Sequence, residues 1–160
     1  MFLVIFFPVV VSHDMPNHPK QALPHQRTRH DHSTEIAEDY VEAVAEITED
    51  SGICRVVDLA KHFGVSHVTV NRTVGRLQNE GLMDTEPYKP VRLTAKGKRL
   101  AHRCRARHEI VYQFLLAIGV DPHAAAVDAE GIEHHVSPAT LACFSRIADL
   151  GPQSQPKVFD

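Results

Sequence analysis

The sequence predicts a mainly α fold, in which an N-terminal winged helix-turn-helix is followed by a second, α-helical domain. Three observations support this prediction. Apolar side chains recur at helical spacing from Ser33 onward. Two short predicted helices are separated by a glycine turn and followed at once by a proline-bounded hairpin. Charge comes in blocks, because residues 33–52 contain seven acidic and no basic side chains, whereas residues 53–107 contain twelve basic and four acidic ones.

The length and the cysteines exclude several classes of protein. A chain of 160 residues is long enough for one domain or two small ones, which excludes a large multidomain enzyme. Cys54, Cys104 and Cys143 are odd in number and widely spaced, so they form neither a disulfide framework nor a Cys-x-x-Cys zinc or redox site. We therefore expect a protein of a reducing compartment, the cytoplasm.

Residues 1–32 are expected to form a disordered tail. The apolar run over residues 1–11 is too short to span a bilayer, is broken by Pro8, and lacks the flanking features of a secretion signal. We interpret the start as lying upstream of the real one, with Met15 as the alternative, and expect no membrane partner. Residues 15–32 are rich in Pro, His and Gln and bury too little apolar surface to fold.

The winged helix-turn-helix domain is expected over residues 33–100. Its first helix runs from Ser33 to Gly52, and a short helix over residues 57–63 ends at a turn built on Gly64. Ser66 then caps a further helix, whose apolar side chains recur at i, i+4 and i+7 and face the core.

Residues 82–86 and 91–93 are predicted to form the two strands of a wing. A helix pair followed directly by a wing, inside a strongly basic block, is typical of binding to double-stranded DNA. The side chains predicted to contact DNA are Ser66, His67, Thr69, Asn71, Arg72, Arg76 and Lys89.

The second domain is expected over residues 101–151, followed by a loose tail at residues 152–160. A long helix is predicted over residues 94–118, and two shorter ones over residues 122–134 and 138–150. Each of the shorter helices opens with an N-cap residue followed by proline.

The helix over residues 122–134 carries candidate metal ligands. Glu130, Glu133 and His134 are spaced at i, i+3 and i+4 and are expected to point from one face. Two carboxylates and an imidazole near an apolar surface repel or lose solvation unless a cation joins them. His108 and an Asp-x-x-Glu pair on the first helix supply further donors. This oxygen-rich set without sulfur suits Mn²⁺ or Fe²⁺, with Zn²⁺ and Co²⁺ as substitutes.

Three longer motifs carry a family resemblance. They are Glu38-Asp39-Tyr40-Val41-Glu42, Arg107-His108-Glu109 and Asp128-Ala129-Glu130-Gly131-Ile132-Glu133-His134-His135. With these motifs the chain resembles the manganese transport regulators (MntR) within the diphtheria toxin repressor (DtxR) family of metal-dependent transcriptional regulators. By motif, the resemblance implies six metal ligands: Asp39, Glu42, His108, Glu130, Glu133 and His134. The iron-responsive branch has Met and Cys in the places of Asp39 and Glu133, so the two oxygen donors here favour manganese.

The resemblance implies a manganese-responsive DNA-binding regulator, usually a repressor of manganese uptake genes. It implies a homodimer held by the C-terminal helices, so that the second domain is an α-helical dimerisation domain, and a palindromic operator. Six ligands suffice for one Mn²⁺ ion per subunit, and five of them could bridge a pair. We expect no enzymatic activity and no small organic ligand.

The placement of the donors predicts a mechanism. Asp39 and Glu42 belong to the helix that packs on the DNA-reading pair, whereas His108 and residues 130–134 belong to the other half, so Mn²⁺ would hold one half to the other. Without metal, the acidic faces of the two halves are expected to repel each other. A palindromic operator requires recognition helices about 34 Å apart, and fixing that spacing lowers the entropy lost on binding.

Three alternatives stay open at this point. An iron-responsive regulator of the same family would share the fold. A metal-independent dimeric DNA-binding module would leave the carboxylates solvated and place His108 and His134 in the core. A ferritin-like di-metal oxidase needs Glu-x-x-His pairs in a four-helix bundle, and the nearest approach here is Glu130-x-x-Glu133-His134. No His-Glu-x-x-His motif or Gly-rich phosphate loop is present in the sequence.

Overall fold

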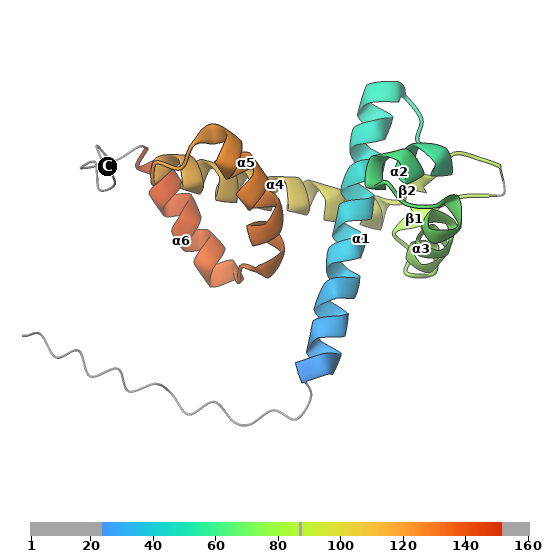
Figure 1. Cartoon of the computed structure of the whole chain (residues 1–160), viewed down its shortest axis with the longest axis horizontal. Coiled ribbons are helices and arrows are strands. Elements are labelled where there is room, and N and C mark those ends of the chain that lie inside the picture. The colour runs from blue at the N-terminus through green and yellow to red at the C-terminus, as the bar shows by residue number, and fades with distance from the viewer. Residues whose placement is uncertain (1–23, 87, 152–160) are drawn as a thin grey trace, which may run out of the picture.

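The computed structural model describes residues 24–86 and 88–151 (Figure 1). The predicted tails therefore lie outside the described residues at 1–23 and 152–160. The elements follow in the order α1 (Pro24–Ser51), α2 (Val56–Phe63), α3 (His67–Asn79), β1 (Met83–Asp84), β2 (Arg92–Leu93), α4 (Ala95–Ala117), α5 (Pro122–Ile132), the 3-10 turn η1 (Glu133–His135) and α6 (Pro138–Asp149). The mainly α fold predicted from the sequence is confirmed.

Helix α1 begins at Pro24, well before the predicted start at Ser33. Proline suits the first turn of a helix, because the N–H that it lacks would have no partner there. Once packing holds residues 33–51 helical, each added residue gains a hydrogen bond without a new nucleation cost. The expectation of disorder is therefore wrong for residues 24–32. The polar composition of this segment predicted disorder only because the segment was assessed without the helix that it extends.

The helix-turn-helix has the predicted local chemistry. Gly64 ends α2 in the left-handed conformation, with φ of 64°, which glycine adopts without steric cost. The Ser66 hydroxyl caps α3 by accepting a hydrogen bond from the backbone N–H of Thr69 at 3.2 Å. Val70 and Leu77 of α3 are fully buried. These three predictions are confirmed.

The wing is shorter than predicted. Strands β1 and β2 pair antiparallel only at Met83 with Leu93 and at Asp84 with Arg92. Pairing stops there because the backbone N–H of Val91 donates instead to the carbonyl of Cys54 at 2.8 Å. The side of the wing that lies nearest the core is thereby tied to the segment between α1 and α2.

Helix α4 serves both halves of the molecule. Figure 1 shows it crossing α1 and continuing between α5 and α6. Its Ala101 packs in the first hydrophobic core, among side chains of α1, α2, α3 and the wing, whereas Val111 and Leu115 pack in a second core with α5. The predicted division between residues 100 and 101 falls inside this helix, so a continuous helix joins the halves.

Helix α5 ends earlier than predicted. It stops at Ile132, and residues Glu133–His135 form η1 instead of a last α-helical turn. Tightened 3-10 turns are common at helix ends, and Ser137, which precedes Pro138, is disfavoured in the α conformation. The tighter turn buries Glu133, of which 2% is exposed.

None of the helices in the described ranges has the length and apolar content needed to cross a membrane.

Candidate metal centre and DNA-binding surface

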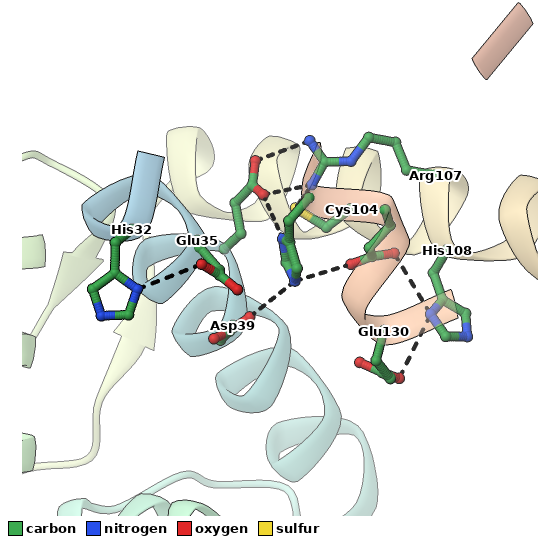
Figure 2. Close-up of polar contacts among 10 residues, drawn as sticks. His32, Glu35, Asp39, Cys104, Arg107, His108 and Glu130 are labelled. Carbon is green, nitrogen blue, oxygen red and sulfur yellow. Dashed lines mark hydrogen bonds and ion pairs between the residues drawn. The ribbon is translucent and has the colours of Figure 1, made fainter. Parts of the chain in front are cut away.

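The predicted metal ligands gather where α1, α4 and η1 meet. His134, on η1, directs its Nε2 atom at Asp39 of α1, 3.2 Å from Oδ1, and lies 3.6 Å from Glu133 Oε1. The imidazole ring of His134 thus connects α1 and η1, which are far apart in the sequence. Figure 2 shows Asp39 on one side of this cluster and His108 with Glu130 on the other.

His108 forms the second imidazole of the cluster. Its Nδ1 atom lies 3.5 Å from Glu133 Oε2 and 3.5 Å from Glu130 Oε1. The ring is parallel to that of Tyr112, with 6.5 Å between ring centroids, which limits its movement. The sequence predicted Glu130, Glu133 and His134 on one helical face, but His134, on the 3-10 turn, points to Asp39 of α1, whereas Glu130, on α5, and Glu133 face His108.

Burial and close contact between charged groups shift the pKa values of several side chains in the cluster. Burial, and then the charge of Glu133, raises the pKa of Glu42 to about 8. Burial also raises the pKa of Glu133, whose buried Oε2 atom has no hydrogen-bond partner among the described residues and has His108 Nδ1 at 3.5 Å. Hydrogen bonds to Asp39 and then to Glu38 raise the pKa of His134 to about 10. Burial thus favours the protonated forms of Glu42 and Glu133, whereas hydrogen bonds to carboxylates favour the cation of His134.

A divalent cation fits this donor set. Among the residues that the structure describes, no three His, Cys, Asp or Glu side chains are already arranged to coordinate a metal ion. An orphaned buried carboxylate oxygen on Glu133 and an unfavourably placed carboxylate on Glu42 are what a cation would satisfy. The donors are oxygen and imidazole nitrogen, which suit Mn²⁺ or Fe²⁺.

Two residues in contact with this cluster were missed as functional residues by sequence reasoning. Glu38 accepts a hydrogen bond from His134 Nδ1 at 2.9 Å and two more from Arg107, at 2.9 and 2.6 Å. Burial opposes ionisation of Glu38, but the bonds from His134 and Arg107 outweigh it and lower its pKa to about 2. A signal was present, because Glu38 lies three residues before the core residue Val41, a position expected to be apolar.

The predicted DNA-contacting residues lie mostly on one surface. His67, Asn71 and Lys89 line a groove of about 660 Å³ between α3 and the wing. Arg72 and Lys89 are exposed. The hydroxyls of Ser66 and Thr69 are 3.0 Å apart at the start of α3, so both are used in capping the helix.

Arg76 differs from the others. Its guanidinium donates to the hydroxyl and to the backbone carbonyl of Ser33 on α1, and lies 3.2 Å from Glu80. The structure therefore directs Arg76 at α1, where it joins two helices, and not at the surface predicted to read bases. The spacing of residues within α3 could not reveal this contact, because Ser33 lies 43 residues away from Arg76 in the sequence.

Val68 is a surface residue that the prediction omitted. It is 77% exposed near the start of α3, opposite the buried face formed by Val70, Val74 and Leu77. Val68 lies four residues before the exposed Arg72, and in a major groove the thymine methyl group is an apolar partner for such a side chain.

Comparison with known proteins assigns both halves of the chain. Residues 32–91 match the family described as the iron dependent repressor, N-terminal DNA binding domain. Residues 94–151 match the family described as the iron dependent repressor, metal binding and dimerisation domain.

Individual relatives agree with these matches. The chain is 44% identical over 119 residues to Transcriptional regulator MntR of Escherichia coli O6:H1, an alignment that covers 74% of this chain and 77% of the relative. It is 38% identical over 118 residues to HTH-type transcriptional regulator MntR of Bacillus subtilis strain 168, covering 74% and 81%. These relatives are named as regulators, which agrees with the prediction of a chain without enzymatic activity.

Solved structures share the fold. One is described as a manganese-dependent transcriptional repressor in complex with manganese; it is 28% identical to this chain, with a TM-score of 0.64, and the match covers 71% of this chain and 52% of that one. This chain thus spans about half the length of that protein. ScaR with bound Zn²⁺ is 23% identical, with a TM-score of 0.61, covering 71% and 53%.

Proposed function

This chain belongs to the iron-dependent repressor family, also called the diphtheria toxin repressor (DtxR) family, and we propose that it is a manganese-responsive transcriptional regulator of the cytoplasm. It binds double-stranded operator DNA as a homodimer and represses manganese uptake genes when manganese is plentiful. The observation that carries this proposal is the cluster of carboxylate and imidazole donors at the junction between the DNA-binding half and the helical half, where none of the six proposed ligands is a cysteine.

The six residues proposed to hold manganese come from both halves. They are Asp39, Glu42, His108, Glu130, Glu133 and His134. If manganese is bound by these residues, it would supply the positive charge that carboxylates from α1 and η1 lack. Relatives at 38–44% identity are named MntR, and a structure of the same fold contains manganese, which supports manganese over the iron-responsive alternative.

The DNA-binding role rests on the groove between α3 and the wing. His67, Asn71 and Lys89 line it, and Arg72 is exposed nearby. A recognition helix presented beside a wing suits major-groove binding, with the wing on phosphate. The side chains proposed to contact DNA are His67, Val68, Asn71, Arg72 and Lys89, with Ser66 and Thr69 near the start of the helix.

The homodimer is proposed to form through the C-terminal helices. In the described chain α6 contains no buried residue, although Phe144 stacks on Phe114 with 3.9 Å between ring centroids. Val127 is 62% exposed and Leu150 is 71% exposed. A second copy would cover these apolar side chains, and a two-fold dimer reads a palindromic operator with half-sites about one helical turn apart.

The chain's own contacts supply the route from metal site to DNA. Asp39 lies on α1, and Ser33 on the same helix binds Arg76 of α3. The Arg76 side chain thus connects α1 to α3. The sequence predicted that the acidic faces of the two halves repel each other without metal. His134 and Arg107 lie among the carboxylates of the two halves, so two basic side chains already offset part of that negative charge.

An equilibrium titration tests this function. Metal-free protein is titrated onto an operator fragment in the presence of Mn²⁺, Fe²⁺, Zn²⁺ or Co²⁺ in turn. Mn²⁺ is expected to raise operator affinity most at the lowest free concentration. Equal affinity with and without metal would instead identify the metal-independent module, and a preference for Fe²⁺ would identify the iron-responsive alternative.

A further inference from the structure

We propose that Glu38, held by Arg107, is a positioning residue that orients the His134 imidazole so that its Nε2 atom faces the metal. Glu38 is not itself a ligand in this proposal. The inference rests on the proposed function, since it concerns how the same site is prepared for manganese.

The two nitrogens of His134 have different partners. Nδ1 lies 2.9 Å from Glu38 Oε2, whereas Nε2 faces Asp39 Oδ1 at 3.2 Å and Glu133 Oε1 at 3.6 Å. Since Glu38 accepts the Nδ1 proton, Nε2 is the nitrogen that points to the two carboxylates proposed as ligands. A carboxylate behind a metal-binding histidine fixes both the ring orientation and the nitrogen that is offered.

Arg107 restrains Glu38 in turn. Its two terminal nitrogens donate to the two oxygens of Glu38, at 2.9 and 2.6 Å. The carboxylate therefore cannot rotate without breaking a bidentate pair. The Glu38 side chain is 8% exposed and the His134 side chain 6% exposed, so water does not readily replace either partner.

These contacts also explain why adjacent carboxylates have different roles. Glu38 Oε1 is bonded to Arg107, and Oε2 is shared by Arg107 and His134. Asp39 is bonded to His134 Nε2 and is 40% exposed at its side chain. Asp39 can therefore turn to an arriving cation, whereas Glu38 would have to give up three hydrogen bonds.

The chain contains a matched pair that has the same chemistry without the histidine. Arg105 binds Glu49 through two hydrogen bonds, at 3.2 and 3.0 Å, and also joins α4 to α1. The side chains of Arg105 and Glu49 are 55% and 61% exposed, and in the described part of the chain these hydrogen bonds join Arg105 to Glu49 and not to a proposed metal ligand. Glu49→Ala therefore controls for the loss of an ion pair between these two helices.

The test compares Glu38→Ala, Glu38→Gln and Glu49→Ala with the unchanged chain. Manganese affinity is measured from the electron paramagnetic resonance signal of free Mn²⁺. The His134 ring is followed separately by ¹H–¹³C NMR of the metal-free protein. We expect Glu38→Ala to weaken manganese binding about 10- to 100-fold and to shift and broaden the His134 ring signals. Glu38→Gln, which keeps an acceptor for Nδ1–H, should recover part of both effects.

Glu49→Ala should change manganese affinity less than about twofold and leave the His134 signals in place. The proposal is wrong if the Glu38 variants bind manganese as tightly as Glu49→Ala, or if their His134 signals are unchanged. Should Glu38→Ala not fold, Glu38→Gln decides on the same two measurements. Failure of the unchanged chain to bind manganese would overturn the proposed function itself.

Discussion

Asp39 and Glu133 determine how hard the donor set is. Both offer carboxylate oxygen close to His134 Nε2, and hard oxygen donors favour manganese over metals that prefer sulfur. We expect the double variant Asp39→Met with Glu133→Cys to broaden activation from Mn²⁺ toward Fe²⁺ and Zn²⁺. Operator titrations in each metal measure this change. An unchanged metal ranking would place selectivity outside these two residues.

Arg72 and Lys89 are expected to contribute to DNA binding in different ways. Arg72→Ala should cost about 1–3 kcal/mol of operator affinity and relax sequence preference at one base pair, as expected for a side chain that reads bases. Lys89→Ala should weaken all sequences alike and reduce the slope of log affinity against log salt by about one unit. Operator and random duplexes titrated at several salt concentrations separate the two effects.

Arg76→Ala serves as the contrast, because Arg76 binds Ser33 of α1. We expect it to lower the free energy of unfolding while leaving the base preference of the folded protein intact. Relaxed sequence preference in Arg76→Ala, at the level of Arg72→Ala, would show that Arg76 reads bases after all.

Cys54 introduces a pH dependence. Burial, and then the charge of Asp58, raises the pKa of the Cys54 thiol from 9.0 to about 11. The buried thiol is thus kept neutral in the folded state. Its contribution to stability is complete below pH 9 and is lost as pH rises toward 11, where only the unfolded chain ionises readily.

The loss at pH 10 is expected to be about 1 kcal/mol. Urea unfolding at pH 8 and pH 10 measures it, and Cys54→Ala should show a smaller difference between the two pH values. An equal pH dependence in the variant and the unchanged chain would assign the effect to other groups.

At the scale of elements, α4 depends on one close approach to the wing. A Cβ atom built on Gly97 would lie 2.1 Å from the backbone carbonyl oxygen of Leu82. That carbonyl already accepts the N–H of Thr94, which caps α4, at 3.1 Å. Any side chain at residue 97 must therefore push α4 away from β1.

We expect Gly97→Ala to destabilise the fold by about 1–3 kcal/mol, because backbone must move to admit a methyl group. Gly75, inside α3, has no atom of the described residues within 4 Å of such a Cβ, so Gly75→Ala should stabilise by about 1 kcal/mol through helix propensity. Thermal unfolding of both variants without DNA gives the comparison. Equal effects at the two glycines would contradict the close contact with Leu82.

The junction between the two halves of the molecule is expected to determine how metal binding changes the shape of the protein. His134 lies among Glu38, Asp39 and Glu133 and offsets their charge. His134→Ala should therefore loosen the metal-free form and abolish the manganese response. Glu133→Gln removes one carboxylate, so manganese affinity should fall while the metal-free form becomes no looser. Small-angle scattering with and without manganese measures the radius of gyration.

His135→Ala provides the control, since His135 lies on the same turn but is exposed. It should behave like the unchanged chain in both measurements. If His134→Ala is as compact as His135→Ala without metal, charge balance does not hold the halves together. The remaining mechanism would be one in which metal reduces motion without changing the mean shape.

Much of the fold follows from local patterns in the sequence. Helix periodicity, the Gly64 turn and the Ser66 cap predicted the helix-turn-helix, because these signals act over a few residues. The metal-ligand types also follow from the sequence, since the choice of oxygen and imidazole over sulfur depends only on residue identity. The tail at residues 24–32 was misjudged, because its helicity depends on the packed helix that it continues.

Only the tertiary structure shows which side chains meet. Glu38 and His134 are 96 residues apart, and Arg76 binds Ser33 across 43 residues, so no local spacing could reveal either contact. The end of α5 at Ile132 turns His134 toward α1, a consequence of backbone geometry and of the packing of α1 on α4. Residue identity and local spacing account for the donor types and for most of the helices, whereas the partners of Glu38 and Arg76 depend on packing, because contacts between distant residues exist only after the chain has folded.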